Sequence, residues 1–170
     1  IPAVEGCEYI ISSNEAFYLE KFPKRVMIVG GGYIAVEFAG IFDGLGSETH
    51  LLYRGELFLR GFDKDIREFV AQEMTKKGVN LKFNTNVTAI AKQADGTLLV
   101  SLTDGSNLEV DCVMYATGRK PKTENIGLEN TKVECNANGA IIVNDDYQTS
   151  EPSIYGLGDA TDRVQLTPVA

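Results

Sequence analysis

The sequence contains few cysteines, and those few lie far apart. Cys7, Cys112 and Cys135 form no CxxC pair and no Cys/His cluster, which argues against a redox dithiol, a disulfide framework or a metal site built from them. Cys112 lies in the apolar run VDCVMYATG, where we expect a buried, unreactive thiol. The one histidine, His50, falls in a predicted strand, and we expect it to be structural.

Long apolar runs and positive charge are also scarce. No stretch approaches the roughly 20 apolar residues that span a bilayer, and the first residues, IPAVEGCEYI, do not resemble a signal peptide. With 16 basic and 24 acidic side chains the net charge is −8, which disfavours binding to nucleic acid or to anionic lipid. We therefore expect a soluble, cytoplasmic protein without nucleic-acid or membrane partners.

A strand, a glycine turn, a helix and a second strand are predicted in direct succession. RVMIVG (25–30) is apolar and β-rich, as strands buried on both faces are. Residues 33–45 carry apolar side chains at helical spacing, and Gly46 suits the C-cap. The apolar positions are Ile34, Phe38, Ile41, Phe42 and Leu45. ETHLLYR (48–54) predicts the second buried strand, which completes a βαβ unit.

The rest of the chain predicts one more helix and several strands. Asp63 suits the N-cap of a helix over 63–77, Gly78 suits its end, and its apolar face comprises Ile66, Phe69, Val70 and Met74. VNLKF (79–83) predicts a third parallel strand. The turn signals ADG and DGS divide 86–110 into an antiparallel meander. DCVMYATG (111–118) predicts a further buried strand.

These elements predict an α/β fold. We expect a Rossmann-like, three-layer NAD(P)-binding domain with a parallel sheet and an antiparallel β-meander. Residues after Gly118 follow a different pattern, with short apolar runs between polar turns. We expect them to form part of a second domain.

The glycine turn carries the spacing of a dinucleotide-binding motif, Gly30-x-Gly32-x-x-Ala35. In this motif the first glycine permits the sharp turn, the second lets the backbone approach a pyrophosphate, and the small third residue lets helix and strand pack closely. The free N–H groups of the first helical turn then face the anion. Placed between a buried strand and an amphipathic helix, the motif predicts a dinucleotide site.

The segment YRGELFLR (53–60) indicates which dinucleotide is bound. An acid about 20 residues after the motif would accept hydrogen bonds from the ribose 2′-hydroxyl of NAD. Here Arg54 stands at that distance, with Arg60 six residues later, and guanidinium groups suit a 2′-phosphate. Glu56 lies between them and could serve an NAD-type contact, but we interpret it as a solvated loop acid. The predicted coenzyme is NADPH.

Four separated blocks, GGGYIAVEFAGI, YR…LRGFD, ATGRKP and SIYGLGDATD…LTPVA, occur together and in order. In these blocks the chain resembles the pyridine nucleotide-disulfide oxidoreductases over nearly its whole length, and in particular their glutathione-reducing branch. The resemblance implies that residues 1–12 leave an FAD domain, that 13–118 form the NADPH-binding domain, and that 119–170 return to the FAD domain and begin a central domain.

The resemblance also implies roles for individual residues. Those expected to line the NADPH site are Gly31, Tyr33, Ile34, Glu37 and Gly118, with Tyr33 as a ring that covers the flavin until nicotinamide displaces it. Asp159 is expected to bind the FAD ribityl chain, Thr167 the flavin ring edge, and Gln165 to lie near the nicotinamide. The chain departs from the family at Gly156, where alanine is common.

In the intact enzyme the resemblance implies electron transfer from NADPH through FAD and a cysteine pair to oxidised glutathione, and a homodimer. The cysteine pair and a His–Glu acid–base pair are expected outside these 170 residues, so no catalytic residue is assigned here and the chain alone should not turn over. Two alternatives stay open. One is a stand-alone NADP(H)-binding module, and the other is a related reductase for trypanothione, mercuric ion or lipoamide.

Overall fold

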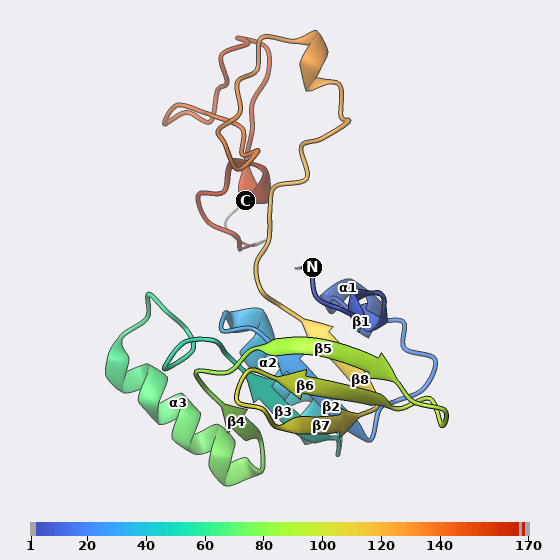
Figure 1. Ribbon diagram of the computed structural model, residues 1–170. Coiled ribbons are helices and arrows are strands. Elements are labelled where there is room, and N and C mark those ends of the chain that lie inside the picture. Colours follow the sequence, from blue (N-terminus) through green and yellow to red (C-terminus); the bar gives the residue numbers. More distant parts are fainter. Residues whose placement is uncertain (1–2, 167, 169–170) are drawn as a thin grey trace. The chain divides into compact units, whose positions relative to one another are not determined.

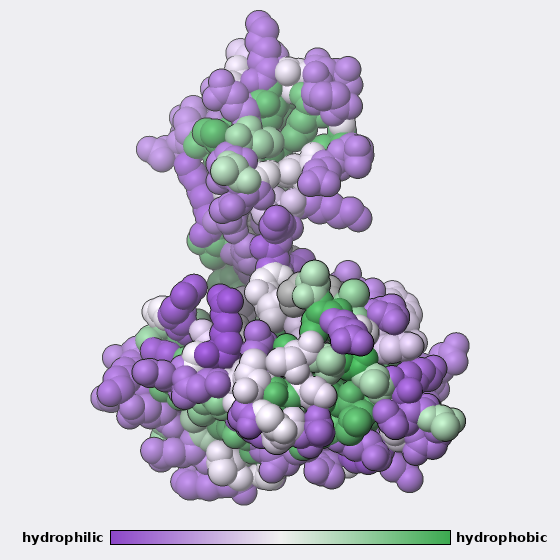
Figure 2. Space-filling view, in the orientation of Figure 1, coloured by the Kyte–Doolittle hydropathy of each residue, from purple (hydrophilic) through white to green (hydrophobic). Residues whose placement is uncertain are grey.

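The computed structural model describes residues 3–166 and 168, and these divide into two compact units between Gly118 and Arg119. The first unit holds all the named helices and strands except two short 3₁₀ helices (Figure 1). In the described part of the chain, no helix has both the length and the apolar character needed to cross a bilayer. On the face seen in Figure 2, hydrophilic side chains predominate on both units.

A five-stranded, wholly parallel sheet lies at the centre of the first unit, with strand order β1-β8-β2-β3-β4. Its strands are β1 (Ile10–Ile11), β2 (Arg25–Val29), β3 (Glu48–Leu52), β4 (Asn80–Lys82) and β8 (Cys112–Tyr115). The chain runs outward from β2 through β3 to β4, and then returns to place β8 on the other side of β2. The order of the strands therefore reverses between β2 and β8, which is where α/β folds place their ligands.

The buried side chains of β2 alternate between the two faces of this sheet. Val26 and Ile28 pack on the side of α2 (Tyr33–Gly44) and α3 (Lys64–Lys77), while Met27 and Val29 pack on the side of the antiparallel meander. The meander consists of β5 (Val87–Lys92), β6 (Leu98–Leu102) and β7 (Asn107–Val110). Each fully buried side chain of this size contributes roughly 1.5–3 kcal/mol. Helices, parallel sheet and meander make three layers, which confirms the predicted fold class.

Helix α2 packs on the sheet through two small residues and one large one. Ala35 and Ala39 are fully buried, together with Phe42, so the helix axis can approach the strands closely. Ile41 and Leu45 share the helical spacing of the apolar residues but are 50% and 66% exposed. Gly46 follows the C-cap residue Leu45 with a φ of 95°, and the N–H groups of Gly46 and Ser47 donate to the carbonyl oxygens of Asp43 and Phe42, so glycine ends the helix as predicted.

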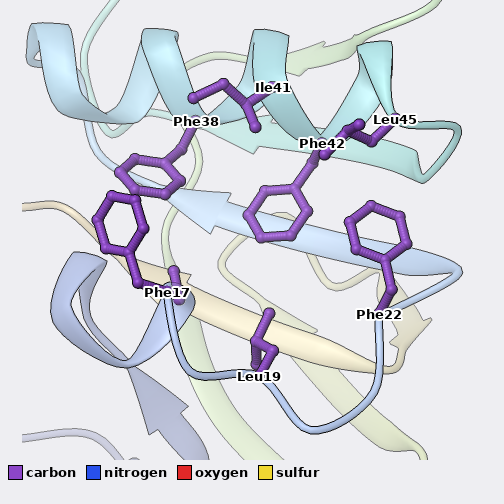
Figure 3. A pocket seen from close by; sticks show the side chains of 8 residues that line it. Phe17, Leu19, Phe22, Phe38, Ile41, Phe42 and Leu45 are labelled. Carbon is purple, nitrogen blue, oxygen red and sulfur yellow. The ribbon is translucent and has the colours of Figure 1, made fainter.

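Large side chains of α2, Phe42 among them, also line an apolar pocket with the end of α1 (Ser13–Ala16) and the segment that follows it (Figure 3). The ring centroids of Phe17 and Phe38 lie 5.7 Å apart, and those of Phe22 and Phe42 lie 5.8 Å apart. The lining residues are Ala16, Phe17, Leu19, Phe22, Phe38, Ile41, Phe42 and Leu45. Since none of these side chains is polar, the pocket does not suit a charged coenzyme.

Helix α3 begins and ends as predicted but buries a narrower face. The Asp63 carboxylate accepts from the N–H groups of Asp65 and Ile66, and Gly78 ends the helix with a φ of 117°. Only Val70 and Met74 of the predicted face join the core; Ile66 and Phe69 are 55% and 60% exposed. The helix packs beside β4 at the edge of the sheet (Figure 1), where a single stripe of side chains meets the strands.

The second unit has little regular structure. Its 3₁₀ helices are η2 (Leu128–Asn130) and η3 (Gly158–Thr161), and isolated antiparallel bridges join Cys135 to Ile141 and Gln148 to Tyr155. Ala140 and Ile141 are its buried apolar residues among those described. In the first unit, η1 (Cys7–Tyr9) is followed by β1, which pairs with β8 at one edge of the parallel sheet. The segment before Ser13 therefore contributes an edge strand.

Candidate functional site

The carboxyl ends of β2, β3 and β8 are level with one another. Val29 pairs with Leu52 of β3 on one side and with Tyr115 of β8 on the other. The next residues of the three strands, Gly30, Tyr53 and Ala116, therefore leave the sheet at the same edge. This edge lies at the strand-order reversal and gathers the glycine motif, the arginine-bearing loop and the loop that leads to Gly118.

Gly30 forms the sharp turn out of β2, with a φ of 155°. Its N–H donates to the carbonyl oxygen of Leu52 at 2.9 Å. A Cβ atom at this position would lie 2.3 Å from the carbonyl oxygen of Ala116 and 3.2 Å from the Cβ of Ala35. The turn thus requires glycine for two separate reasons, its backbone dihedral angle and the closeness of β8 and α2.

Gly31 lies against the start of the loop that follows β3. A Cβ atom at Gly31 would fall 2.2 Å from the Cε2 of Tyr53, so the tyrosine ring occupies the space beside the turn. The Gly31 carbonyl oxygen accepts a hydrogen bond from the Leu59 N–H at 2.6 Å. The loop of residues 53–63 is therefore attached to the glycine turn at both Tyr53 and Leu59.

Gly32 is the N-cap of α2 and faces open space. Among the described residues, no side chain caps the helix start, and a Cβ atom at Gly32 would meet no atom within 4 Å. The free N–H groups of a first helical turn carry partial positive charge and favour an anion. The turn therefore has the shape that a pyrophosphate requires: closed behind Gly30 and open in front of Gly32.

Arg54 and Arg60 are both exposed in the loop that is attached to this turn. Within the described ranges, neither guanidinium has a carboxylate within 4.0 Å. Arg25 differs, since it pairs with Glu109 at 2.7 Å and with Asp111 at 2.8 Å. Glu56 is also exposed and pairs with neither arginine. Both loop arginines are consequently available to an anionic ligand at this edge.

The other predicted residues of the first unit lie at the same edge. Tyr33 and Ile34 begin α2, with Tyr33 38% exposed and Ile34 packed partly against the core. Glu37 lies one turn further along the helix and is exposed. Gly118, two residues after Ala116, is exposed with a φ of 147°. All the residues predicted to bind NADPH except Gln165 therefore belong to the first unit.

The remaining predicted residues belong to the second unit. Asp159 is exposed in η3, and Gln165 donates from its Nε2 to the Oδ1 of Asp162 at 2.5 Å. Thr167 lies outside the described residues. Gly156 is buried, and a Cβ atom there would lie 3.2 Å from the Cγ2 of Ile141 and 3.3 Å from the Cγ1 of Val143. The departure from alanine at Gly156 therefore matches a closely packed position.

Sequence reasoning missed three residues that shape the site: Tyr53, Phe58 and Arg67. Phe58 is fully buried in the loop, and its ring packs edge-on against Phe83 with centroids 5.6 Å apart. Arg67 donates to the carbonyl oxygens of Leu57 and Phe58. The apolar triplet at residues 57–59, between Glu56 and Arg60, was a signal that this part of the loop is buried. Nothing in the local sequence distinguishes Arg67 from other arginines on helices.

The fold and this edge define a dinucleotide-binding α/β domain. The sequence profile described as "Pyridine nucleotide-disulphide oxidoreductase" matches residues 1–170, and the chain belongs to this family. The resemblance inferred from the sequence blocks is thereby confirmed.

Curated relatives include two kinds of reductase. Glutathione reductase of Burkholderia cepacia is 48% identical over all of this chain and 38% of its own length. The chloroplastic/mitochondrial glutathione reductase of Pisum sativum is 48% identical over all of this chain and 31% of its own. Trypanothione reductase of Leishmania donovani is 46% identical over 98% of this chain and 34% of its own length. The chain therefore spans less than two fifths of the length of these relatives.

A solved structure with the same fold is the HOCl-induced flavoprotein disulfide reductase RclA from Escherichia coli. It superposes with a TM-score of 0.91 at 31% sequence identity, over 99% of this chain and 39% of that one. The parallel sheet and the meander described above are thus the architecture of a flavoprotein disulfide reductase.

Proposed function

We propose that residues 13–118 form the NADPH-binding domain of a flavoprotein disulfide reductase, most closely a glutathione reductase. Residues 1–12 would connect it to an FAD domain, and residues 119–170 would return to that domain and begin a central one. The compact unit that ends at Gly118 supports the second boundary. Identities of 48% to glutathione reductases support the choice within the family.

The observation that carries the proposal is the pair of exposed arginines on a loop attached to the glycine turn. The turn accommodates a pyrophosphate in front of Gly32, and the helix start favours its charge. Arg54 and Arg60 lack carboxylate partners among the described residues, and they leave the same sheet edge as the turn. A 2′-phosphate on the adenosine ribose would neutralise both.

Each predicted residue then has a task in binding. Gly30, Gly31 and Gly32 shape the turn, Arg54 and Arg60 bind the 2′-phosphate, and Ile34, Glu37 and Gly118 border the coenzyme. Tyr33 would cover the flavin, and Asp159, Gln165 and Thr167 would belong to the flavin side of the site. When bound, the coenzyme supplies the hydride that starts electron transfer; this chain supplies position and electrostatic stabilisation.

The disulfide substrate is proposed as oxidised glutathione, in a homodimeric intact enzyme. The trypanothione reductase of Leishmania donovani is nearly as similar, at 46% identity, so trypanothione is the second candidate. A lipoamide or mercuric substrate is less favoured, and the arginine pair argues against an NAD-dependent lipoamide enzyme. Cys7, Cys112 and Cys135 are all free and widely spaced, so a redox cysteine pair would come from outside these residues. A cytoplasmic location stays a prediction.

A direct titration tests the coenzyme assignment. The purified protein is titrated with NADPH and with NADH by isothermal calorimetry, and we expect NADPH to bind at least about tenfold more tightly, a difference of about 1.4 kcal/mol. Equal dissociation constants would contradict the proposal. A stand-alone NADP(H)-binding module would bind in the same way, so the size of the native gene product separates the two. A native chain near 18.5 kDa favours the module, and a much longer one favours the reductase.

A further inference from the structure

Arg67 is the third arginine associated with the loop, and two of its donors are already engaged. Its Nε donates to the carbonyl oxygen of Phe58 at 2.7 Å, and its Nη2 donates to that of Leu57 at 2.6 Å. The side chain is partly buried, whereas Arg54 and Arg60 are exposed. Arg67 therefore holds the backbone of the loop, and the two exposed arginines remain free for a ligand.

The position of Arg67 is itself fixed by the start of α3. The Asp63 side chain accepts from two N–H groups of the first turn, and the Arg67 N–H donates to the Asp63 carbonyl oxygen at 3.1 Å. An N-cap of this kind sets where a helix begins. The guanidinium of Arg67 thus extends from a rigid element, and its planar fork can bind two adjacent carbonyl groups at once.

The three residues immediately before Arg60 each form a hydrogen bond through their backbone. Leu57 and Phe58 are held by Arg67 through their carbonyl oxygens, and the Phe58 ring is fully buried. Leu59 donates to the Gly31 carbonyl oxygen and has a φ of 56°, a conformation that a leucine adopts only when its surroundings enforce it. Arg60 follows directly, so the direction of its backbone is set by these contacts.

We propose that Arg67 is a positioning residue for recognition of the ribose 2′-phosphate: it holds the loop that presents Arg60, and with it Arg54, to that group. The inference rests on the proposed coenzyme site. Without the two charged donors, water would solvate the Leu57 and Phe58 carbonyl groups and the loop would gain alternative conformations. Binding the phosphate would then require reordering the loop, whereas contacts made by the glycine turn would be unaffected.

The test uses two ligands that differ by one phosphate, adenosine 2′,5′-bisphosphate and adenosine 5′-monophosphate. The measured quantity is the ratio of their dissociation constants, because a general loss of stability weakens both ligands and leaves the ratio unchanged. Arg67→Met keeps the length of the side chain without its donors. Arg67→Lys keeps the charge but cannot form two parallel hydrogen bonds. Lys76→Met, on the exposed far end of α3, is the matched control for loss of a charge.

We expect Arg67→Met to lower the preference for the bisphosphate about tenfold, or about 1.4 kcal/mol. Arg67→Lys should also lower it, by a smaller factor, and Lys76→Met should retain the wild-type ratio. A folded Arg67→Met protein with the wild-type ratio would overturn the inference. Full preference in Arg67→Lys would do the same, because charge alone would then suffice, and this variant decides the question if Arg67→Met does not fold. A wild-type protein without any preference would refute the coenzyme site itself.

Discussion

A methyl group on Gly30 would lie 2.3 Å from the carbonyl oxygen of Ala116, at the point where the chain turns from β2 into α2 beside the end of β8. Two residues later the situation reverses, and a methyl group on Gly32 would meet no described atom within 4 Å. The two glycines of the motif therefore serve different purposes. Gly30 is required by the fold, whereas Gly32 keeps open the space where we expect the coenzyme.

Alanine substitutions at the two glycines should separate folding from binding. Gly30→Ala adds a clash with backbone and strains a φ of 155°, so we expect a loss of about 2–4 kcal/mol of unfolding free energy. Gly32→Ala changes an N-cap with ordinary φ and should cost less than about 1 kcal/mol. Urea unfolding measures both values.

The Gly32→Ala variant, although stable, should bind the coenzyme weakly. Gly32→Ala places a methyl group where a pyrophosphate would approach, so a stable protein should bind NADPH at least about tenfold more weakly, or about 1.4 kcal/mol. A Gly32→Ala protein with wild-type affinity would show that no dinucleotide lies against this turn.

Replacing both loop arginines should affect one coenzyme and spare the other. In Arg54→Gln/Arg60→Gln, loss of two charge-assisted contacts of about 1.5 kcal/mol or more each should weaken NADPH binding about 100-fold. NADH lacks the 2′-phosphate, so its affinity should change by less than about threefold, or about 0.7 kcal/mol. A titration that follows the fluorescence of each reduced coenzyme measures both dissociation constants. If the affinities for NADPH and NADH fell equally, the arginines would not bind the 2′-phosphate and would act only through the general electrostatic field of the protein.

The Cys112 thiol should be unreactive in the folded protein. Burial, and secondarily the neighbouring Asp111 carboxylate, raises the pKa of Cys112 to about 11. At pH 8, three units lower, only about one such thiol in a thousand is ionised, and the thiolate is the reactive form. Cys7 and Cys135 are exposed, so iodoacetamide followed by peptide mass mapping should label these two in native protein and all three in urea. Rapid native labelling of Cys112 would contradict its burial.

The Arg25–Asp111 pair should contribute to stability in a pH-dependent way. Hydrogen bonding to Arg25 holds the pKa of Asp111 below its ordinary value of 3.8. Its oxygens also accept from the N–H groups of Lys24 and Arg25 at 3.0 and 2.8 Å. A lowered pKa favours folding above the unfolded-state value, and the contribution is lost as the pH falls through the folded-state value.

Asp111→Asn should therefore reduce the unfolding free energy by about 1 kcal/mol at pH 7, a modest value because both side chains are partly exposed. The difference from wild type should stay constant between pH 7 and pH 5 and shrink below about pH 4. Urea unfolding across this range gives the profile, with Glu109→Gln as a control that removes the more exposed contact of Arg25. A difference that grows towards low pH would have the wrong sign for this mechanism.

Sequence periodicity predicted the elements well but predicted their buried faces poorly. Alternating and helical patterns, with the caps at Asp63 and Gly78, placed α3 correctly and gave the parallel sheet and the meander. The glycine motif predicted close packing at Ala35, but the periodicity did not show that Ala39 also faces the sheet and that Ile41 is exposed. A pattern of apolar residues identifies a helix, but the distance between helix and sheet decides which of those residues are covered.

The site was predictable where it depends on local sequence and unpredictable where it depends on the path of a loop. The spacing of Gly30, Gly32 and Ala35 reports a turn that these residues form among themselves. The contacts of Arg67 with Leu57 and Phe58 join residues nine or ten positions apart, across a loop whose course is set by the burial of Phe58. No periodic signal marks such contacts, because they arise only once the loop has packed.

The hydrogen bond from Leu59 to the Gly31 carbonyl oxygen also fixes a neighbouring group. A trans peptide is planar, so its carbonyl and its N–H point in opposite directions, and fixing the Gly31 oxygen fixes the Gly32 N–H. Two adjacent glycines would otherwise allow that plane to rotate with little resistance. The amide that opens the helix is thus oriented before any ligand arrives, and the entropy of orienting it is lost during folding rather than during association.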